Sequence, residues 1–592
     1  MPSYKAPVDD VIFLLTDVLD IDRHRELPGF EDVSRQTLRA ILEEGGRICA
    51  EKLLPLNASG DREGCRRAED GSVATPKGFK AAYEAYREGG WIGLPVPAEY
   101  GGMGLPATLN AVMQEFVTSA NFAFGMYPGL TQGAMAALLV HGSQEQKATY
   151  IPKMAAGEWS GTMNLTEPHC GTDLGLLRTR AAPQPDGSYA ITGQKIFISA
   201  GEHDLAENIV HLVLARIEGA PAGTKGISLF VCPKFIPDAE GRPGRRNALS
   251  CGKIEEKMGI HANATCVMDY DGATAWLVGE ANKGLAAMFV MMNEARLAVG
   301  IQGLGIGEVA YQNAAAYARD RLQGRALTGP KAPDKPADPI IVHPDVRRTL
   351  MTIRALTEAG RALALATALQ ADLYRRAPDE KVRQAADDRL GLMTPVLKAM
   401  LTDYGFTHAV NAQQVLGGHG YIAEWGMEQF VRDARITMIY EGANGIQALD
   451  LVGRKLPRDG GRAMMAFLAE VNGFVRENEA DARMGPYVAP LKASVGHLQQ
   501  ATMWFMQNAI ARPDHAGAGS ADYLHLLGLV ALGHMWGLMA RAALARSEEP
   551  AMQAKLVTGR FFAERLLPET GMRLARITAG ADSVMALPAE MF

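Results

Sequence analysis

The amino-acid sequence predicts an α+β protein that is mostly helical, with one β-rich module between helical regions. Three observations support this fold class. Residues 35–53 carry apolar side chains at helical spacing with charged residues between them. Residues 161–277 change to short β-rich runs separated by turn residues such as Pro185, Asp186 and Gly187. Helical spacing returns near residue 284 and continues to the end of the sequence.

Breaks in these patterns define the individual elements. Glycine and proline make residues 89–105 a loop, helices resume near Asn110, and residues 139–159 predict two short helices around a turn at 141–143. Strands are expected at 189–192, 195–199, 209–215, 227–232 and 266–270. Later helices are expected at 291–322, 347–374, 381–416, 445–455 and in a block over 460–592. We expect four domains, at residues 1–160, 161–280, 281–458 and 459–592.

Composition and charge argue against several classes of protein. The chain has 592 residues, a net charge of −6 and a pI near 6.2, so its charge does not favour binding to nucleic acid. Its six cysteines are scattered without a C-x-x-C pair, which predicts neither a disulfide framework nor a metal site. Free thiols suit a reducing cytosol, and the start of the sequence lacks the pattern of a secretory signal. We therefore expect a cytoplasmic protein.

Two segments allow more than one interpretation. Residues 523–540 are apolar and long enough to cross a bilayer, but two histidines and three glycines favour a buried helix. Residues 300–307 contain four glycines that look like a dinucleotide-binding motif, yet no strand precedes them and the spacing is not G-x-G-x-x-G. Close packing between helices explains these glycines better, and we expect no membrane span.

One carboxylate stands out late in the chain. Glu441 lies between Tyr440 and Gly442, after an apolar run and before a helical one. Gly442 and Gly445 allow the backbone to approach a flat ligand, because glycine has no Cβ. A carboxylate held in apolar surroundings has a raised pKa and can act as a base. From these residues alone, a solvated glutamate at the entry to a helix remains the simpler interpretation.

The order of the elements and five motifs within residues 91–456 resemble the acyl-CoA dehydrogenase family. The first two motifs, MNLTEPHCGTD at 163–173 and GQKIFISAG at 193–201, resemble the two strands that line the flavin in that family. The resemblance implies flavin contacts for six residues: Met163, Leu165, Thr166, Thr172, Phe197 and Ser199. Thr172 is also implied to contact the substrate. Phe197 stands where tryptophan is usual, while Ser199 and Thr172 replace a threonine and a serine.

The next three motifs extend the resemblance. The third comprises KMGIHANA at 257–264 and NKGLAAMF at 282–289, followed by NEAR at 293–296. Arg296 matches an arginine implied to contact substrate, although a structural ion pair is an equal alternative. The fourth, YARDRLQGR at 317–325, resembles an R-x-Q motif, which implies that Arg321 and Gln323 bind the FAD of a neighbouring subunit. The fifth is QQVLGGHG at 413–420, which implies flavin contacts for Gln414, Gly417 and Gly418.

The Y-E-G sequence after the fifth motif matches the position of the family's catalytic base. Some members carry the base on the long helix instead, but that position is Ala295 here. Glu294 is one residue away and would point about 100° aside on a helix. The resemblance therefore implies that Glu441 is the base, with Tyr440 and Gly442 at the substrate and Gly445 at the flavin. Ala443 stands where threonine is common, so a hydroxyl contact to the flavin is lost.

The resemblance implies both a fold and an activity. The fold has an N-terminal helical domain, a middle β domain and a helical bundle, here with an additional C-terminal helical domain. The implied reaction is FAD-dependent α,β-dehydrogenation of a short or medium acyl-CoA to the trans-2-enoyl-CoA. The implied acceptor is an electron-transfer flavoprotein, and the implied assembly is a homodimer.

The extra N-terminal stretch and the C-terminal helical block resemble the longer bacterial branch of the family. Within that branch, overall similarity favours the enzymes that dehydrogenate 3-methylthiopropanoyl-CoA during dimethylsulfoniopropionate degradation. Three alternatives remain open at this point. Two keep the chemistry: a general fatty acyl-CoA dehydrogenase and an acyl-CoA oxidase. The third is a DNA-associated alkylation-response flavoprotein, which the acidic pI opposes because binding to DNA needs a basic face.

Overall fold

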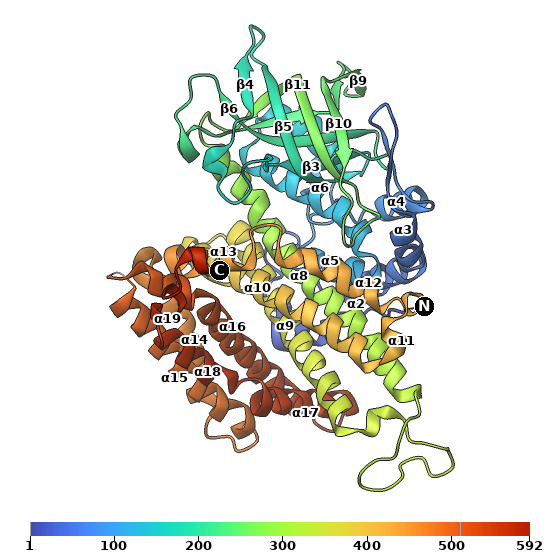
Figure 1. Ribbon diagram of the computed structural model, residues 1–592, viewed down its shortest axis with the longest axis vertical. Helices are drawn as coiled ribbons and strands as arrows, with labels where there is room; N and C mark the ends of the chain where they lie inside the picture. Colours follow the sequence, from blue (N-terminus) through green and yellow to red (C-terminus); the bar gives the residue numbers. More distant parts are fainter. Residues whose placement is uncertain (1, 510) are drawn as a thin grey trace. The chain divides into compact units, whose positions relative to one another are not determined.

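The computed structural model describes residues 2–509 and 511–592 of the chain (Figure 1). The spatial contacts between Cα atoms divide these residues into two compact units. The mixed unit is Glu44–Ala298, and the helical unit joins the described residues up to Glu43 with Val299–Phe592. Helices α2 (Arg35–Ile48) and α8 (Gly284–Asp320) contribute residues to both units.

The mixed unit begins with helices. α3 (Asn57–Glu63) and α4 (Phe79–Glu88) precede the expected loop at 89–105, which carries a short 3-10 turn. α5 (Ala107–Ala120), α6 (Phe122–His141) and α7 (Gln144–Ala155) follow. At the start of α7, the Ser143 hydroxyl accepts from the Gln146 amide while the Gln146 side chain accepts from the Ser143 amide. The predicted turn at 141–143 and the short helix after it are confirmed, whereas the helix before the turn is the 20-residue α6, which begins at Phe122 and not within residues 139–159.

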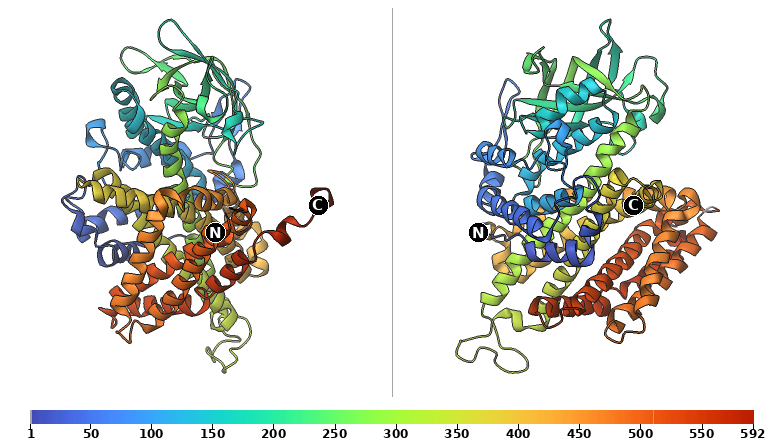
Figure 2. Two further views of the ribbon diagram at one scale, coloured as in Figure 1. Left: turned by 90° about the vertical axis from the view of Figure 1, so that its left-hand side faces the viewer. Right: turned by 180° about the vertical axis from the view of Figure 1, so that it is seen from behind.

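Seven strands of the described residues form one sheet, in the order β10-β11-β5-β4-β6-β3, and β7 pairs with both β11 and β6. The strands are β3 (Trp159–Asn164), β4 (Arg180–Pro183), β5 (Tyr189–Ser199), β6 (Asn208–Ile217), β7 (Ser228–Pro233), β10 (Leu249–Ile254) and β11 (Thr265–Val278). β3 and β4 run parallel to β6, and the other pairs are antiparallel. Two small hairpins pair β1 (Arg66–Arg67) with β2 (Val73–Ala74) and β8 (Phe235–Pro237) with β9 (Pro243–Arg246). Helix α6 packs on β3 (Figure 2).

The β-rich module is confirmed, and its five predicted runs lie in four strands. The runs at 189–192 and 195–199 belong to the single strand β5. Its pairing with β11 steps from Lys195 opposite Met268 to Ile198 opposite Cys266, so one extra residue bulges out of β5. The strands β3, β4, β8, β9 and β10 were not predicted, because their short, partly polar sequences lack a clear alternation.

The helical unit contains a bundle and a C-terminal block. The bundle comprises α8, α9 (Pro344–Arg376), α10 (Glu380–Val415), α11 (Gly418–Tyr421), α12 (Met427–Arg435) and α13 (Asn444–Asp450). The block comprises α14 (Arg462–Asn478), α15 (Gly485–Asn508), α16 (Pro513–Leu544), α17 (Pro550–Arg565), α18 (Glu569–Thr578) and α19 (Asp582–Met585). α16 packs on α9, α10 and α13, and α17 packs on α9 (brown and red in Figure 1). The block therefore shares a core with the bundle.

Glycines on α8 allow it to lie close to α10. A Cβ on Gly303 would come within 2.3 Å of the Leu401 carbonyl oxygen, and one on Gly300 within 3.1 Å of the Leu397 oxygen. On α10, a Cβ at Gly405 would lie 2.4 Å from the Gly303 carbonyl oxygen. The prediction that the α8 glycines serve close helix packing is confirmed.

A buried cluster of charges ties the N-terminal segment to the rest of the helical unit. Asp10 of α1 (Val8–Ile12) pairs with Arg361 of α9 at 2.6 Å and with Lys555 of α17. Arg361 also pairs with Glu308 of α8 at 2.6 Å, and Lys555 with Glu358 of α9 at 2.7 Å. Burial acts to raise the pKa of Asp10, but Lys555 and Arg361 outweigh it and hold that pKa below its ordinary value. One ionic cluster thus connects the N-terminal segment, the bundle and the C-terminal block.

Two helices of the described residues are apolar and long enough to cross a membrane, α8 and α16. In α16, 89% of the most apolar window is buried inside the protein, which is typical of a core helix. The corresponding window of α8 is 50% buried. The interpretation of residues 523–540 as a buried helix is therefore confirmed.

Candidate active site

Glu441 lies in a tight turn between a 3-10 turn at Ile436–Met438 and helix α13. Its backbone φ is +55°, a left-handed conformation that is uncommon outside glycine, and Gly442 follows at +86°. The Glu441 side chain is half-buried. A residue keeps such a conformation only where its surroundings impose it, so the neighbours of this turn decide where the carboxylate lies.

The first neighbours hold the backbone of the turn. Gln447 is completely buried, and its Nε2 donates to the carbonyls of Glu441 at 3.2 Å and Gly442 at 3.1 Å. The Tyr440 hydroxyl donates to the side-chain oxygen of Gln302 on α8. Burial, together with the charge of Glu441, raises the pKa of Tyr440 well above its ordinary value, so the phenol stays neutral beside the carboxylate.

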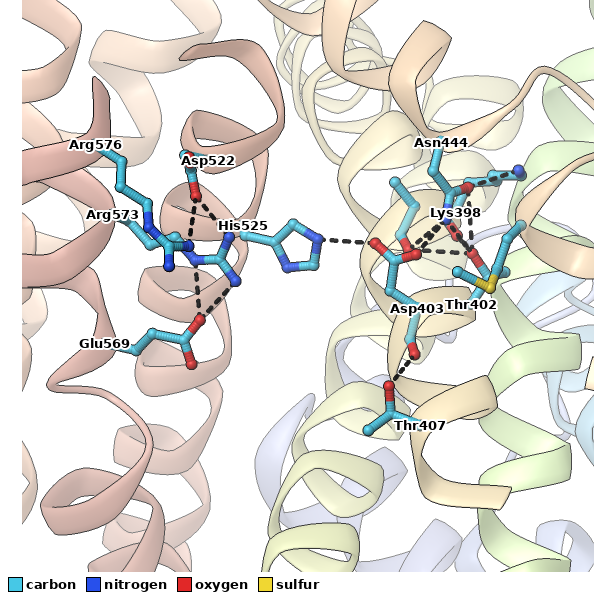
Figure 3. Close-up of polar contacts among 12 residues, drawn as sticks. Lys398, Thr402, Asp403, Thr407, Asn444, Asp522, His525, Glu569, Arg573 and Arg576 are labelled. Atoms are coloured by element: carbon cyan, nitrogen blue, oxygen red, sulfur yellow. Dashed lines mark hydrogen bonds and ion pairs between the residues drawn. The ribbon is translucent and has the colours of Figure 1, made fainter. Parts of the chain in front are cut away.

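Helix α10 supplies a second anchor (Figure 3). Asn444, the first residue of α13, accepts a hydrogen bond from Lys398 at 2.8 Å. It donates to the Thr402 hydroxyl at 3.0 Å and to Asp403 Oδ1 at 2.7 Å. Both donor and acceptor atoms of this amide are therefore engaged three residues after Glu441.

Sequence reasoning missed this anchor. One signal was available, because Lys398 stands alone in the apolar run TPVLKAML at 394–401. A charge on a buried helix face needs a polar partner, and Lys398 is completely buried here. The identity of that partner, Asn444, depends on how α10 and α13 pack.

In the mixed unit, the first two motifs lie side by side. The Ile196 amide donates to the Thr166 carbonyl at 2.9 Å, and Lys195 Nζ donates to the Leu165 carbonyl at 3.0 Å. Lys195 also pairs with Glu167 at 2.9 Å, and both side chains are buried. Burial lowers the pKa of Lys195 to about 8. Burial acts to raise the pKa of Glu167, but Lys195 and hydrogen bonds hold it below its ordinary value, so the pair stays ionised.

Phe197 projects from the β5 bulge. It is 61% exposed, and its φ of +59° is an outlier for a bulky aromatic residue. Bulges redirect side chains and are common beside active sites. Ser199 follows, half-buried, opposite Thr265 of β11. The flavin contacts of Phe197 and Ser199 stay predictions, which this geometry favours because an exposed ring can stack on a flat ligand.

The remaining predicted residues of the mixed unit are spread over three elements. Met163 is half-buried on β3, and Thr172 is exposed in the loop that follows. Arg296 is 7% exposed on α8. A buried arginine fits a structural role as well as a substrate contact, so its assignment stays a prediction.

The fourth and fifth motifs meet in the helical unit. Tyr317, near the end of α8, shares a hydrogen bond of 2.9 Å with His419 of α11, although the two residues are 102 positions apart. Arg321 and Gln323 follow α8 with exposed side chains that have no hydrogen-bond or ion-pair partner among the described residues. The segment around His419 carries the other residues predicted to contact the flavin, and these residues are also exposed: Gln414, Gly417 and Gly418.

One group of described residues has the composition of a metal site, namely Glu167, His169 and Cys170. The Glu167 carboxylate is already the ion-pair partner of Lys195. It also accepts hydrogen bonds from the amides of Arg178 at 2.7 Å and Thr179 at 3.0 Å. Both Glu167 oxygens are therefore engaged by protein groups, and we assign no metal to this group of residues.

Comparison with known proteins gives the family. Residues 35–158 match the acyl-CoA dehydrogenase N-terminal domain, 162–273 the middle domain and 282–456 the C-terminal domain, while 467–588 match an acetyl-CoA dehydrogenase C-terminal-like domain. The chain belongs to the acyl-CoA dehydrogenase family. It is 46% identical to the 3-methylmercaptopropionyl-CoA dehydrogenase of Ruegeria pomeroyi over 98% of this chain and 99% of that protein.

Two further relatives are similar to this acyl-CoA dehydrogenase over nearly its whole length. The broad-specificity linear acyl-CoA dehydrogenase FadE5 of Mycobacterium tuberculosis is 36% identical over 96% of each chain. The crystal structure of an acyl-CoA dehydrogenase from Bacillus anthracis complexed with FAD shares the fold, with a TM-score of 0.76 and 21% identity over 97% of this chain and 92% of that one. The predicted family, fold class and cofactor are confirmed: the protein is an FAD-dependent acyl-CoA dehydrogenase.

The residues of this acyl-CoA dehydrogenase fit FAD. In the mixed unit, the exposed ring of Phe197 and the exposed hydroxyl of Thr172 suit contacts with an isoalloxazine. In the helical unit, the guanidinium of Arg321 is a planar charged fork that suits a diphosphate. A Cβ added to Gly417 or Gly418 would meet nothing within 4 Å, so the backbone there is open to a ligand.

Proposed function

We propose that this acyl-CoA dehydrogenase oxidises 3-methylthiopropanoyl-CoA to 3-methylthioacryloyl-CoA. The supporting observation is the 46% identity to a 3-methylmercaptopropionyl-CoA dehydrogenase over 98% of the chain; methylmercapto and methylthio name the same group. That similarity runs from end to end and includes the C-terminal block. It is therefore more specific than a match to the shared domains of the family.

We propose Glu441 as the base of this reaction. The thioester carbonyl acidifies the α-carbon, whose proton passes to the Glu441 carboxylate. Bound FAD supplies the acceptor for the hydride that leaves the β-carbon, so a double bond forms between the two carbons. The chain's own contribution is to hold the carboxylate in place, through Gln447 and Asn444.

We also propose a cytoplasmic homodimer that passes its electrons to an electron-transfer flavoprotein. The cytoplasm is supported by six cysteines that are all free. A dimer is supported by the exposed Arg321 and Gln323, which the family resemblance assigns to the partner's flavin. Peroxide formed during turnover in air tests the acceptor. One peroxide formed for each enoyl-CoA would identify an acyl-CoA oxidase instead.

The substrate is tested with a series of acyl-CoA thioesters and an artificial electron acceptor. We expect efficient turnover of 3-methylthiopropanoyl-CoA, overlapping turnover of butanoyl- and pentanoyl-CoA, and little turnover of palmitoyl-CoA. These thioesters are expected to be turned over together because one methylene group in an apolar slot changes the free energy of transition-state binding by only about 1–3 kcal/mol. The measurement is kcat/KM for each thioester.

A second candidate is a general fatty acyl-CoA dehydrogenase. It is favoured by the 36% identity to a relative described as broad-specificity and linear. A maximum of kcat/KM at lauroyl-CoA or a longer chain would select this candidate over the first.

A further inference from the structure

We propose that the C-terminal block positions the base-bearing turn through His525, which makes this histidine a positioning residue for the dehydrogenation. The inference rests on the proposal that Glu441 is the base. It assigns a role to the helices after residue 460, whose function the sequence leaves open.

A continuous chain of side chains connects the block to the turn. His525 lies on α16, and its Nε2 is 2.9 Å from Asp403 Oδ2 on α10. The other oxygen of Asp403 accepts from Asn444 at 2.7 Å, three residues after Glu441. Figure 3 shows His525 pointing from the C-terminal helices toward Asp403, and Asp403 lying between His525 and Asn444. The carboxylate of Asp403 is thus shared between the block and the turn.

His525 is itself held in place. The ring of Tyr404, the next residue of α10, contacts it edge-on, with 5.9 Å between ring centres. One turn earlier on α16, Asp522 accepts from Arg573 of α18 at 2.6 Å, and Arg573 also pairs with Glu569 at 2.6 Å. The Asp522–Arg573 pair joins α16 to α18, and the contact with Tyr404 places the imidazole of His525 against α10.

The Asn444 amide explains why such support matters. α13 is seven residues long, and a helix of that length is not stable by itself. Asn444 must present its oxygen to Lys398 and its amino group to Asp403, so the position of that carboxylate selects the orientation of the amide. The Asp403 side chain is 28% exposed, so loss of His525 leaves water competing with Asn444 for its carboxylate.

Release of Asp403 would remove an acceptor from Asn444 and loosen the turn that carries Glu441. Misplacement of a catalytic group by about 1 Å can cost up to ~100-fold in rate, while contacts that only bind substrate stay intact. His525 therefore affects kcat more than KM. Its loss also affects the mobility of residues 436–447 more than the overall stability of the protein.

The test compares three variants of the full-length holoprotein. His525→Leu removes the contact to Asp403, and His525→Gln keeps an N–H donor at a similar reach. The matched control is His497→Leu, because His497 also lies in the block and also makes one side-chain hydrogen bond, to Thr570 at 3.0 Å within the block. The readouts are kcat and KM with butanoyl-CoA, and hydrogen exchange of a peptide that covers residues 436–447.

His525→Leu is expected to lower kcat about 10-fold with KM within about twofold of wild type, and to speed exchange in the 436–447 peptide. His525→Gln should restore most of the wild-type kcat and most of the wild-type protection of the 436–447 peptide. His497→Leu should change neither kcat nor the exchange of that peptide. Wild-type kcat and exchange in His525→Leu, or an equal loss in His497→Leu, would overturn the inference. Glu441→Gln is measured in parallel to separate the two proposals. If Glu441→Gln stays active, the assignment of the base fails. If Glu441→Gln is inactive but His525→Leu is fully active, only the positioning role of His525 is refuted.

Discussion

Glu441 and Phe197 both adopt left-handed backbone conformations, with φ of +55° and +59°. Such a conformation costs on the order of 1–3 kcal/mol in a residue other than glycine, so it persists where the surroundings impose it. Gln447 fixes the carbonyls beside Glu441, and the pairing of β5 with β11 on either side of the bulge fixes Phe197. Both residues also belong to motifs that the sequence alone singles out.

The first prediction concerns the base. Glu441→Gln should retain FAD and bind acyl-CoA but lose turnover by about 10²–10⁴-fold, because an amide cannot take the α-proton. Flavin absorbance and kcat with 3-methylthiopropanoyl-CoA measure both effects. Glu294→Gln, which changes the neighbouring candidate on α8, should remain active. The assignment fails if the Glu441 variant stays within about tenfold of wild type.

At the scale of elements, the crossing of α8 and α10 sets the framework of the turn. Gly303 and Gly405 bring the two helix backbones together. Gln302 of α8 then accepts from Tyr440 just before Glu441, and Asp403 of α10 accepts from Asn444 just after the turn. Close approach of these helices is therefore a condition for the geometry at Glu441.

The second prediction tests this crossing. Gly303→Ala places a Cβ 2.3 Å from the Leu401 carbonyl oxygen, so the helices must separate. Overpacking of this kind typically costs about 1–3 kcal/mol, which a shift in the urea midpoint measures. Gly496→Ala on α15 is the control, because a Cβ there meets nothing within 4 Å. It should be neutral or stabilise by about 0.4–1 kcal/mol. Equal midpoints for the two variants would show that the crossing tolerates a side chain.

At the scale of the whole molecule, the chain buries ionisable groups in both units. The helical unit keeps charged groups buried by pairing them, as in the cluster of Asp10, Arg361 and Lys555. Four buried histidines behave differently, because burial lowers the pKa of each to about 3 and keeps it neutral: His203, His211, His408 and His534. These histidines make stability depend on pH.

The third prediction follows from their pKa values. Between pH 6.5 and about 3 the unfolded chain binds protons at these histidines that the folded protein does not bind. Their contribution to stability is therefore complete above pH 6.5 and is lost as the pH falls. Each histidine accounts for up to about 1.4 kcal/mol per pH unit. Urea unfolding at several pH values should show a shallower dependence for His408→Gln, and an unchanged dependence would contradict the assignment.

The fourth prediction concerns assembly. If Arg321 contacts the partner's flavin, dimerisation and retention of FAD are linked by mass action. Arg321→Ala should therefore lose FAD on dilution and elute as a smaller species on a sizing column. The control is Arg319→Ala, which removes an exposed arginine two residues earlier and should behave as wild type. A monomer with full flavin occupancy would exclude the shared site.

The sequence by itself determined the order of helical and β-rich regions, the family, the cofactor and the candidate base. These follow from local spacing and from motifs in which each residue's role is set by near neighbours. It also separated the α8 glycines from a dinucleotide-binding motif, because that motif needs a preceding strand.

Only the tertiary structure decided how those motifs are supported. The contacts of Asn444 with Lys398 and of His525 with Asp403 join residues 46 and 122 positions apart. The single strand β5 with its bulge, and the ion pair of Lys195 with Glu167, likewise depend on pairing across the sheet. Local spacing predicts which face of an element is buried, whereas the partner of a buried polar group is set by the packing of elements that are remote in sequence.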